Sequence, residues 1–172
     1  MENKIKQLTL AAMCLSIGVI MPQALHAIPD AGNMFLPMHI PTMLCGFLCG
    51  PIFGLLVGLL SPLLSHFVFS MPPVIMLGQM IVELGVYGFV IGFLNQKINI
   101  KKKVIKQYFI LIIAMVMGRV VYGVLNALLF KAGNYSFSIW LTAAFITGLP
   151  GIIVQLIFVP ILVDMTKRLL NE

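Results

Sequence analysis

The chain has 172 residues, of which 60% are hydrophobic and only 9% are charged, and its mean hydropathy is +1.08. A soluble domain needs a more highly charged surface, so this composition excludes one and predicts an integral membrane protein. Between Lys6 and Lys97 the only charged residues are Asp30 and Glu83. The net charge of +6 comes from basic clusters at expected helix ends, so it does not indicate nucleic-acid binding.

The apolar runs predict an all-α integral membrane protein with six transmembrane helices in a single domain, residues 1–172. In chain order, the expected helices are Lys6–Leu25, His39–Cys49, Ile52–Phe69, Val74–Leu94, Val104–Phe130 and Ser138–Leu170. The second and third are short and meet at Gly50-Pro51, a break that favours tilted or only partly spanning helices. In the alternative topology, four helices span the membrane fully and the second and third form a re-entrant hairpin. The first run lacks a small-residue cleavage site and is expected to be a retained helix.

The basic clusters predict the orientation of the chain. Lys4 and Lys6, the segment Lys97–Lys106, and the pair Lys167/Arg168 fall on one side only if an even number of spans precedes each. The positive-inside rule then predicts a multi-pass cell-membrane protein with cytoplasmic N- and C-termini. Residues Pro22–Met38 become the first extracellular loop, which is rich in proline yet apolar. Two interpretations of this loop stay open: a cap over a pocket, or a plug over the helix ends.

Small residues and sulfur-containing residues have simple packing interpretations. The pairs Gly54/Gly58 and Gly88/Gly92 have the spacing that lets membrane helices approach closely. Cys45 and Cys49 lie four residues apart in an apolar run, which favours helix packing over a metal or redox site. The three histidines are spread over separate segments, so no metal site is expected.

Two charged side chains are expected at membrane depth, Glu83 near the middle of the fourth helix and Arg119 near the middle of the fifth. An ionised side chain at the bilayer centre costs at least about 2.5–3.5 kcal/mol, so each must face the protein interior. One hypothesis is a buried ion pair that fixes the helix register. The other is that Arg119 holds a substrate anion or oxygen while Glu83 orients it.

Polar side chains recur on one face of each of the last three helices. They are Gln79, Glu83 and Tyr87 on the fourth, Arg119, Tyr122 and Asn126 on the fifth, and Trp140, Thr147 and Gln155 on the sixth. Residues Gly148–Gly151 are expected to loosen the sixth helix midway. Three inward polar faces predict a wet or ligand-filled cavity between these helices. The aromatic residues favour a flat ring in the ligand.

The segments Leu36–Pro62, Met71–Pro73, Glu83–Gly88 and Gly118–Gly123, in this order, give the chain its likeness to a known family. It resembles the substrate-binding (S) components of energy-coupling-factor (ECF) vitamin transporters over nearly its whole length. The resemblance implies high-affinity binding of a micronutrient by the last three helices and the first extracellular loop. Asn33 and Phe35 in this loop, and His39 directly after it, are also expected to bind the substrate.

The resemblance also implies partners. These are a transmembrane coupling (T) subunit, contacted through the first three helices, and two cytoplasmic ATPases. The family docks through alanines spaced four residues apart on the first helix, and here Ala12 and Ser16 take those positions. No Walker-type glycine-rich loop occurs in the chain, which fits ATP hydrolysis by the partners. No cofactor is expected. Pantothenate, pyridoxine-type, folate-type, thiamine-precursor and cobalamin substrates all stay open.

The sequence leaves one other class of function open and argues against a second. A stand-alone proton-coupled secondary carrier, with Glu83 as the coupling carboxylate, is the alternative, and dependence of uptake on the ATPase module discriminates the two. An intramembrane enzyme is not expected, because no nucleophile–base or metal constellation is found at membrane depth.

Overall fold

The computed structural model describes residues 2–24, 35–130 and 136–170, and the regular structure within these ranges is helical. The helices are α1 (Glu2–Ala24), α3 (His39–Cys49), α4 (Pro51–Phe69), α5 (Val74–Lys97), α6 (Lys103–Leu125), α7 (Phe137–Leu141) and α8 (Leu149–Leu170). Two π-helical segments, η1 (Asn126–Phe130) and η2 (Thr142–Thr147), follow α6 and α7. The prediction of an all-α fold is therefore confirmed for the described residues.

Among the described residues, five helices are long and apolar enough to cross a membrane: α1, α4, α5, α6 and α8. The expected span at 39–49 is present as α3 with the predicted bounds, but its 11 residues extend only about 16 Å. That is roughly half of a bilayer's hydrocarbon thickness of about 30 Å. The count of six crossings therefore stays a prediction. The first extracellular loop lies mostly outside the described residues.

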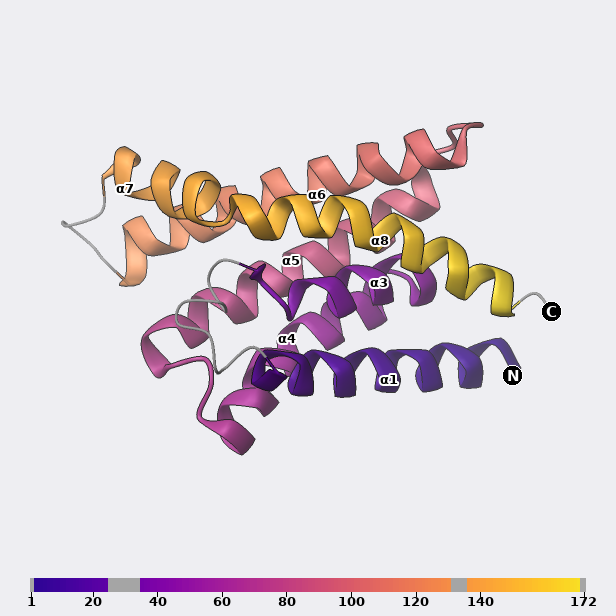
Figure 1. The fold of residues 1–172 in the computed structure, drawn as a ribbon, viewed down its shortest axis with the longest axis horizontal. Coiled ribbons are helices and arrows are strands. Elements are labelled where there is room, and N and C mark those ends of the chain that lie inside the picture. The colour runs from indigo at the N-terminus through magenta and orange to yellow at the C-terminus, as the bar shows by residue number, and fades with distance from the viewer. Residues whose placement is uncertain (1, 25–34, 131–135, 171–172) are drawn as a thin grey trace.

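The short helix α3 lies at the centre of the bundle (Figure 1). It contacts α1, α4, α5 and α8, and every one of its residues except Leu44 and Leu48 is buried. The core of the protein forms around it, with Met43 and Phe47 of α3 packed among side chains of α5, α6 and α8. A helix that is apolar all round is expected to be buried in this way.

The α3–α4 break occurs where glycine and proline were expected to place it. Gly50 has a φ of +89°, a conformation that side chains other than glycine's rarely adopt, and Pro51 opens α4 at its first position. The amide of Asn95 in α5 donates to the Phe47 carbonyl at 3.1 Å and ties the end of α3 to α5. The turn is therefore fixed by backbone geometry and by one side chain.

The α4–α5 pair is the most extensive helix contact in the fold. Gly54 and Gly88 face each other across it so closely that a Cβ on either would clash with the other's carbonyl group. Gly58 meets the backbone of Leu84 in the same way, and Gly92 meets the turn at Gly50-Pro51. The predicted role of these glycines in close helix packing is confirmed.

The last expected helix, Ser138–Leu170, is not continuous. It is divided into α7, η2 and α8, with a turn at Gly148. The loosening expected at Gly148–Gly151 is present at its start, and Pro150 follows as an early residue of α8, where its missing N–H is tolerated. The preceding wide turns of η2 were not predicted.

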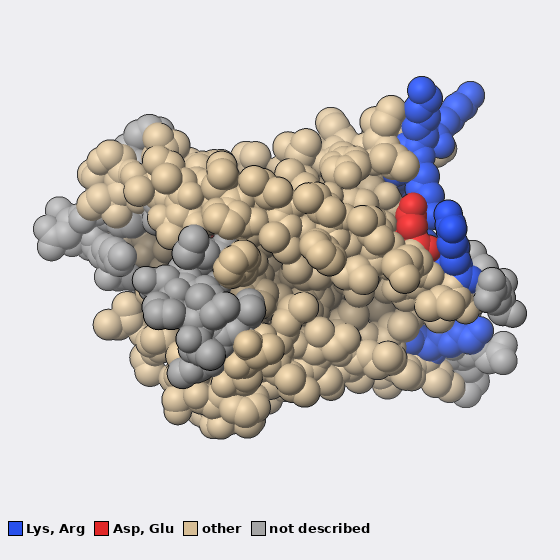
Figure 2. Space-filling model, viewed as in Figure 1, with Lys and Arg blue, Asp and Glu red and all other residues tan. Residues whose placement is uncertain are grey.

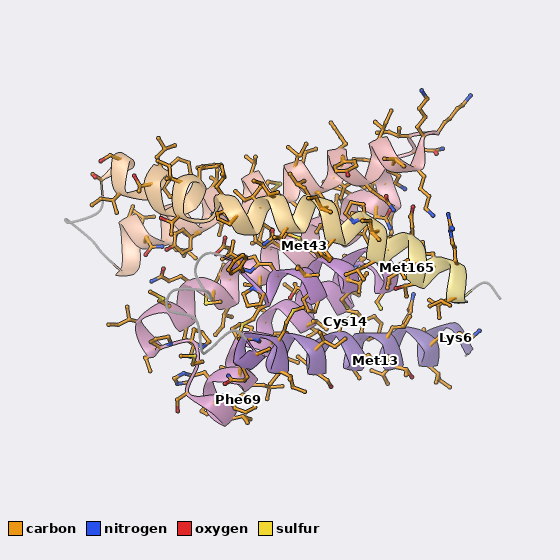
Figure 3. All side chains as sticks on the ribbon, viewed as in Figure 1. Lys6, Met13, Cys14, Met43, Phe69 and Met165 are labelled. Atoms are coloured by element: carbon orange, nitrogen blue, oxygen red, sulfur yellow. The ribbon has the colours of Figure 1, made fainter. Side chains whose placement is uncertain are left out.

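The lysine and arginine side chains that are visible in Figure 2 lie at one end of the bundle. Lys6 marks this end and Phe69 lies toward the opposite end (Figure 3). The end of α8 is tied to α6 here: Lys103 Nζ lies 2.9 Å from Asp164 Oδ1, and Gln107 Nε2 donates to the same oxygen at 2.7 Å. On the face that Figure 2 shows, no charged side chain of the described residues is visible along the middle of the bundle.

Candidate functional site

The polar face expected on α5 is buried. Gln79, Glu83 and Tyr87 are each less than a tenth exposed. The Tyr87 hydroxyl donates to Glu83 Oε1 at 3.1 Å, one helical turn away. Gln79 donates instead to the carbonyl of Ile75 on its own helix at 2.8 Å. Glu83 and Tyr87 thus form the chemically richer part of this face.

His39, the first residue of α3, reaches the same point from a second element. Its Nε2 lies 3.9 Å from Glu83 Oε1, and its ring centroid lies 5.2 Å from that of Tyr87. All three side chains are almost fully buried. The burial of α3 brings them together, because a helix that crossed the bilayer at the protein edge would leave His39 at a surface.

Arg119 approaches from α6 and is also buried. Its neighbour Gly118 lies flat against the Tyr87 ring, where a Cβ would come within 2.9 Å of Tyr87 Cδ1. The guanidinium interacts electrostatically with the Tyr87 hydroxyl, and its Cζ lies 5.9 Å from the centroid of the Phe145 ring. We call His39, Glu83, Tyr87 and Arg119 the buried polar centre.

Aromatic side chains from the divided last helix cover Arg119. The indole Nε1–H of Trp140 donates to the Arg119 carbonyl at 3.0 Å. Gly123 makes room for this ring, since a Cβ there would collide with the indole. Phe145 of η2 meets Trp140 edge to face, with a centroid distance of 5.6 Å. Trp140 is therefore held beside the buried polar centre, as a site residue would be.

Asn126 and Gln155 are fully buried at the edges of this region. The Asn126 amide donates to the Tyr122 carbonyl at 2.8 Å, but Asn126 Oδ1 accepts no hydrogen bond from a described residue. Both amide atoms of Gln155 and both ring nitrogens of His39 likewise find no hydrogen-bond partner among the described residues. Each such atom costs about 1–3 kcal/mol if it stays unpaired. Buried polar groups of this kind mark places where a ligand or water belongs.

Two of the expected residues lie away from the buried polar centre, and a third lies outside the described residues. Thr147 is exposed, contrary to the inward face expected for it, because η2 and the turn at Gly148 change the rotation of the chain before α8. Phe35 is half-buried and directly precedes Leu36, whose carbonyl accepts the His39 N–H at 3.1 Å. Phe35 therefore lies beside the buried polar centre. Asn33 lies outside the described residues.

Phe145 and Gly118 are site residues that the sequence reasoning missed. Phe145 stands in the apolar run Ala143–Ile146, so no pattern distinguishes it from a lipid-facing residue. Gly118 directly precedes Arg119. A small residue beside an arginine expected to be buried is the only sequence signal that another side chain packs closely at this position. The cavity expected between the last three helices stays a prediction.

The expected docking positions Ala12 and Ser16 lie on the outer face of α1. The Ser16 hydroxyl donates to the Ala12 carbonyl at 3.0 Å, which satisfies its polar group within the helix. Met13, Ile17 and Ile20 on the outer face are also largely exposed. The opposite face of α1 packs on α3 and α4 through Ala11 and Cys14.

The model of the family described as "ECF transporter, substrate-specific component" matches residues 6–163. The chain belongs to this family. It is therefore a multi-pass membrane protein and a substrate-binding subunit of an ECF transporter. No curated protein and no solved structure matches it. The resemblance found in the sequence is confirmed, and in an ECF substrate-specific component the buried polar centre is the natural candidate for the substrate site.

Proposed function

We propose that this ECF substrate-specific component binds a micronutrient, a vitamin or a vitamin precursor, with high affinity and delivers it across the membrane. One observation carries the proposal: side chains of opposite charge and several unpaired polar atoms are buried midway along an otherwise apolar bundle. Such groups are expensive inside a membrane and are kept for function. Within this proposal Arg119 holds an oxygen of the substrate, and Glu83 and Tyr87 orient it.

The remaining expected residues take supporting roles in the same proposal. His39, Gln155 and Asn126 supply hydrogen bonds, and Trp140 and Tyr122 supply aromatic surface. Gln79 and Phe35 lie toward the side from which the substrate enters, and Asn33, outside the described residues, is a further proposed contact. The first extracellular loop caps the site. The contacts of Trp140 with Arg119 and Gly123 support the aromatic part of this assignment.

The proposed orientation has the basic end in the cytoplasm, as the positive-inside rule requires. Lys6 in α1 lies at this end (Figure 3), and the C-terminal end of α8 lies at the same end of the bundle (Figure 1). A chain that starts and finishes at the same end makes an even number of passes. Six passes follow if α3 is counted as a short span shielded from lipid by its neighbours. Both termini are then cytoplasmic.

The proposed partners are the transmembrane coupling subunit and two cytoplasmic ATPases, which hydrolyse the ATP. The exposed small residues Ala12 and Ser16 form the centre of the docking face on α1, because small side chains let a partner helix approach closely. Thus Ala12→Leu and Ser16→Leu should reduce co-purification of the three partner polypeptides by at least tenfold. Ile20→Leu, an apolar exchange on the same outer face, is the matched control and should leave it unchanged.

Uptake measurements complete the test. Substrate uptake should require the ATPase module and should fall in the two docking variants, while substrate binding by the isolated subunit stays intact. Normal uptake after deletion of the ATPase genes would refute the proposal.

A proton-coupled secondary carrier is the second candidate, and the 3.9 Å contact of Glu83 with His39 favours it. Two titratable groups in contact at membrane depth are a feature of proton relays. Uptake that persists without the ATPases and collapses when the proton gradient is dissipated would establish this function instead.

A further inference from the structure

The unpaired buried atoms of the site contain both donors and acceptors. They are Gln155 Nε2 and Oε1 on α8, the two ring nitrogens of His39 on α3, and Asn126 Oδ1 on η1. All three side chains are at most 1% exposed. α3 and α8 are in contact, and Ile152 and Leu156, on either side of Gln155, pack on the cluster that contains Ile40 and Met43. The contact of α3 with α8 favours one ligand that supplies complementary groups to both helices.

The balance of these groups excludes a ligand whose recognised end is purely an acceptor. A carboxamide presents a donor and an acceptor side by side in one plane, and a neutral imidazole presents one of each. A carboxylate or phosphate offers acceptors only, so it would leave Gln155 Oε1 and Asn126 Oδ1 unpaired. A cyclic amide or urea, with N–H beside C=O, satisfies both atoms of Gln155 through two parallel hydrogen bonds.

The charges of the buried polar centre point in the same direction. Glu83 and Arg119 contribute formal charges of −1 and +1, so this pair offers no net positive charge to an anion. The Glu83 carboxylate, which accepts from Tyr87 and faces His39, would repel a second carboxylate in a site of low dielectric constant. Arg119 can still donate to a neutral carbonyl oxygen.

The rings around the centre favour a flat ligand. The rings of His39 and Tyr87 lie 5.2 Å apart, and Trp140 and Phe145 form an edge-to-face pair beside Arg119. Aromatic side chains in such number stack on planar π systems and add little for a flexible aliphatic chain. Planarity also places the N–H and C=O of a ring in the plane that a carboxamide can match.

We propose that this site takes an uncharged planar heterocycle whose lactam or cyclic urea edge pairs with Gln155. The inference rests on the proposed function, because it names the substrate class of the same site. Its consequence for specificity is direct. The subunit recognises the ring edge of its nutrient and discriminates against small molecules whose main recognition group is a carboxylate.

The test compares neutral lactams with carboxylates of matched ring size. The ligand-stripped full-length subunit in lipid nanodiscs is titrated calorimetrically with uracil, lumazine and lumichrome, and with nicotinate, quinoline-2-carboxylate and acridine-9-carboxylate. At least one lactam should bind about 100-fold more tightly than its size-matched carboxylate, because two hydrogen bonds separate them.

The variant Gln155→Leu should weaken that lactam about 100-fold. It should also raise the melting temperature of the ligand-free subunit, since it removes an unpaired buried amide. This second readout separates lost recognition from misfolding. Gln96→Leu, the same exchange at an exposed position of α5, is the matched control and should leave affinity unchanged.

Three results would overturn the inference: a carboxylate that binds as tightly as its matched lactam, an unchanged lactam affinity in Gln155→Leu, or no binding of any of the six probes. If the coupling subunit and ATPases still co-purify in those cases, the proposed function stands and only the substrate class is wrong. Loss of both binding and co-purification would remove both proposals.

Discussion

Replacing Gly88 with alanine should destabilise the protein, although alanine is the better helix former. A Cβ at position 88 would overlap the carbonyl of Gly54 and lie 3.0 Å from its Cα, whereas carbon atoms pack best at about 3.5–4.0 Å. Both atoms belong to the backbone, so no rotamer change relieves the overlap. α4 and α5 must therefore separate by about 0.5–1 Å, which forfeits a quarter to a half of the dispersion energy at each contact.

The expected loss follows from two opposing terms. Overpacking a close-packed contact costs about 1–3 kcal/mol, and removing glycine from a helix returns about 0.5–1 kcal/mol. Between membrane helices there is no hydrophobic driving force to compensate for lost packing. A net loss of about 1–2 kcal/mol is expected, which corresponds to a decrease in melting temperature of about 2–8 °C for a chain of this size.

Thermal unfolding in lipid nanodiscs measures this effect. Gly78→Ala on the same helix is the control, because Gly78 is not among the glycines at which an added Cβ would meet a described atom. It should leave the melting temperature unchanged or raise it by a few degrees through helix propensity alone. Equal melting temperatures for the two variants would refute the close approach of α4 and α5.

Three further predictions concern the site and the basic end. Arg119→Ala should abolish substrate binding while the protein stays folded by circular dichroism; unchanged affinity would give Arg119 a purely structural role. Asp164→Ala should lower the free energy of unfolding by about 1–3 kcal/mol, because the buried amide of Gln107 loses its acceptor, whereas Lys103→Ala should lower it by at most about 1 kcal/mol. Denaturant titrations that rank the two variants in the opposite order would contradict this assignment. Trp140 is the chain's only tryptophan, so substrate should change the intrinsic fluorescence; a saturating ligand that leaves the spectrum unchanged would place the binding site away from Trp140.

The positions of the helices could be predicted from the sequence because the bilayer imposes strict rules on it. Long apolar runs must be helical, and prolines, glycines and lysines mark their ends. The bounds of α3 agree with prediction, and α4 begins at Pro51, one residue before its expected start. The division of the last helix was only partly foreseen. η2 depends on how Phe145 and Trp140 pack, and packing leaves no trace in an apolar run.

The site was predictable within each helix and unpredictable between helices. Positions four residues apart share a helix face, which correctly predicted that Glu83 and Tyr87 are buried together. The contact of His39 with Glu83 joins residues 44 positions apart. This contact depends on the position of α3 in the bundle, and the spacing of residues along the sequence does not determine that position.

The short length of α3 explains how a carboxylate is kept at this depth. An α-helix concentrates about half a positive elementary charge at its N-terminus, where the first N–H groups lack intrahelical partners. α3 begins at His39, whose Nε2 lies 3.9 Å from Glu83 Oε1, so the positive end of a buried helix lies near the carboxylate. A helix that spanned the whole bilayer would carry this end to the membrane surface and leave Glu83 with side-chain partners alone. Because α3 begins inside the protein, the positive end of its dipole lies near Glu83 without adding another cation, and the Arg119 guanidinium keeps donors for the substrate.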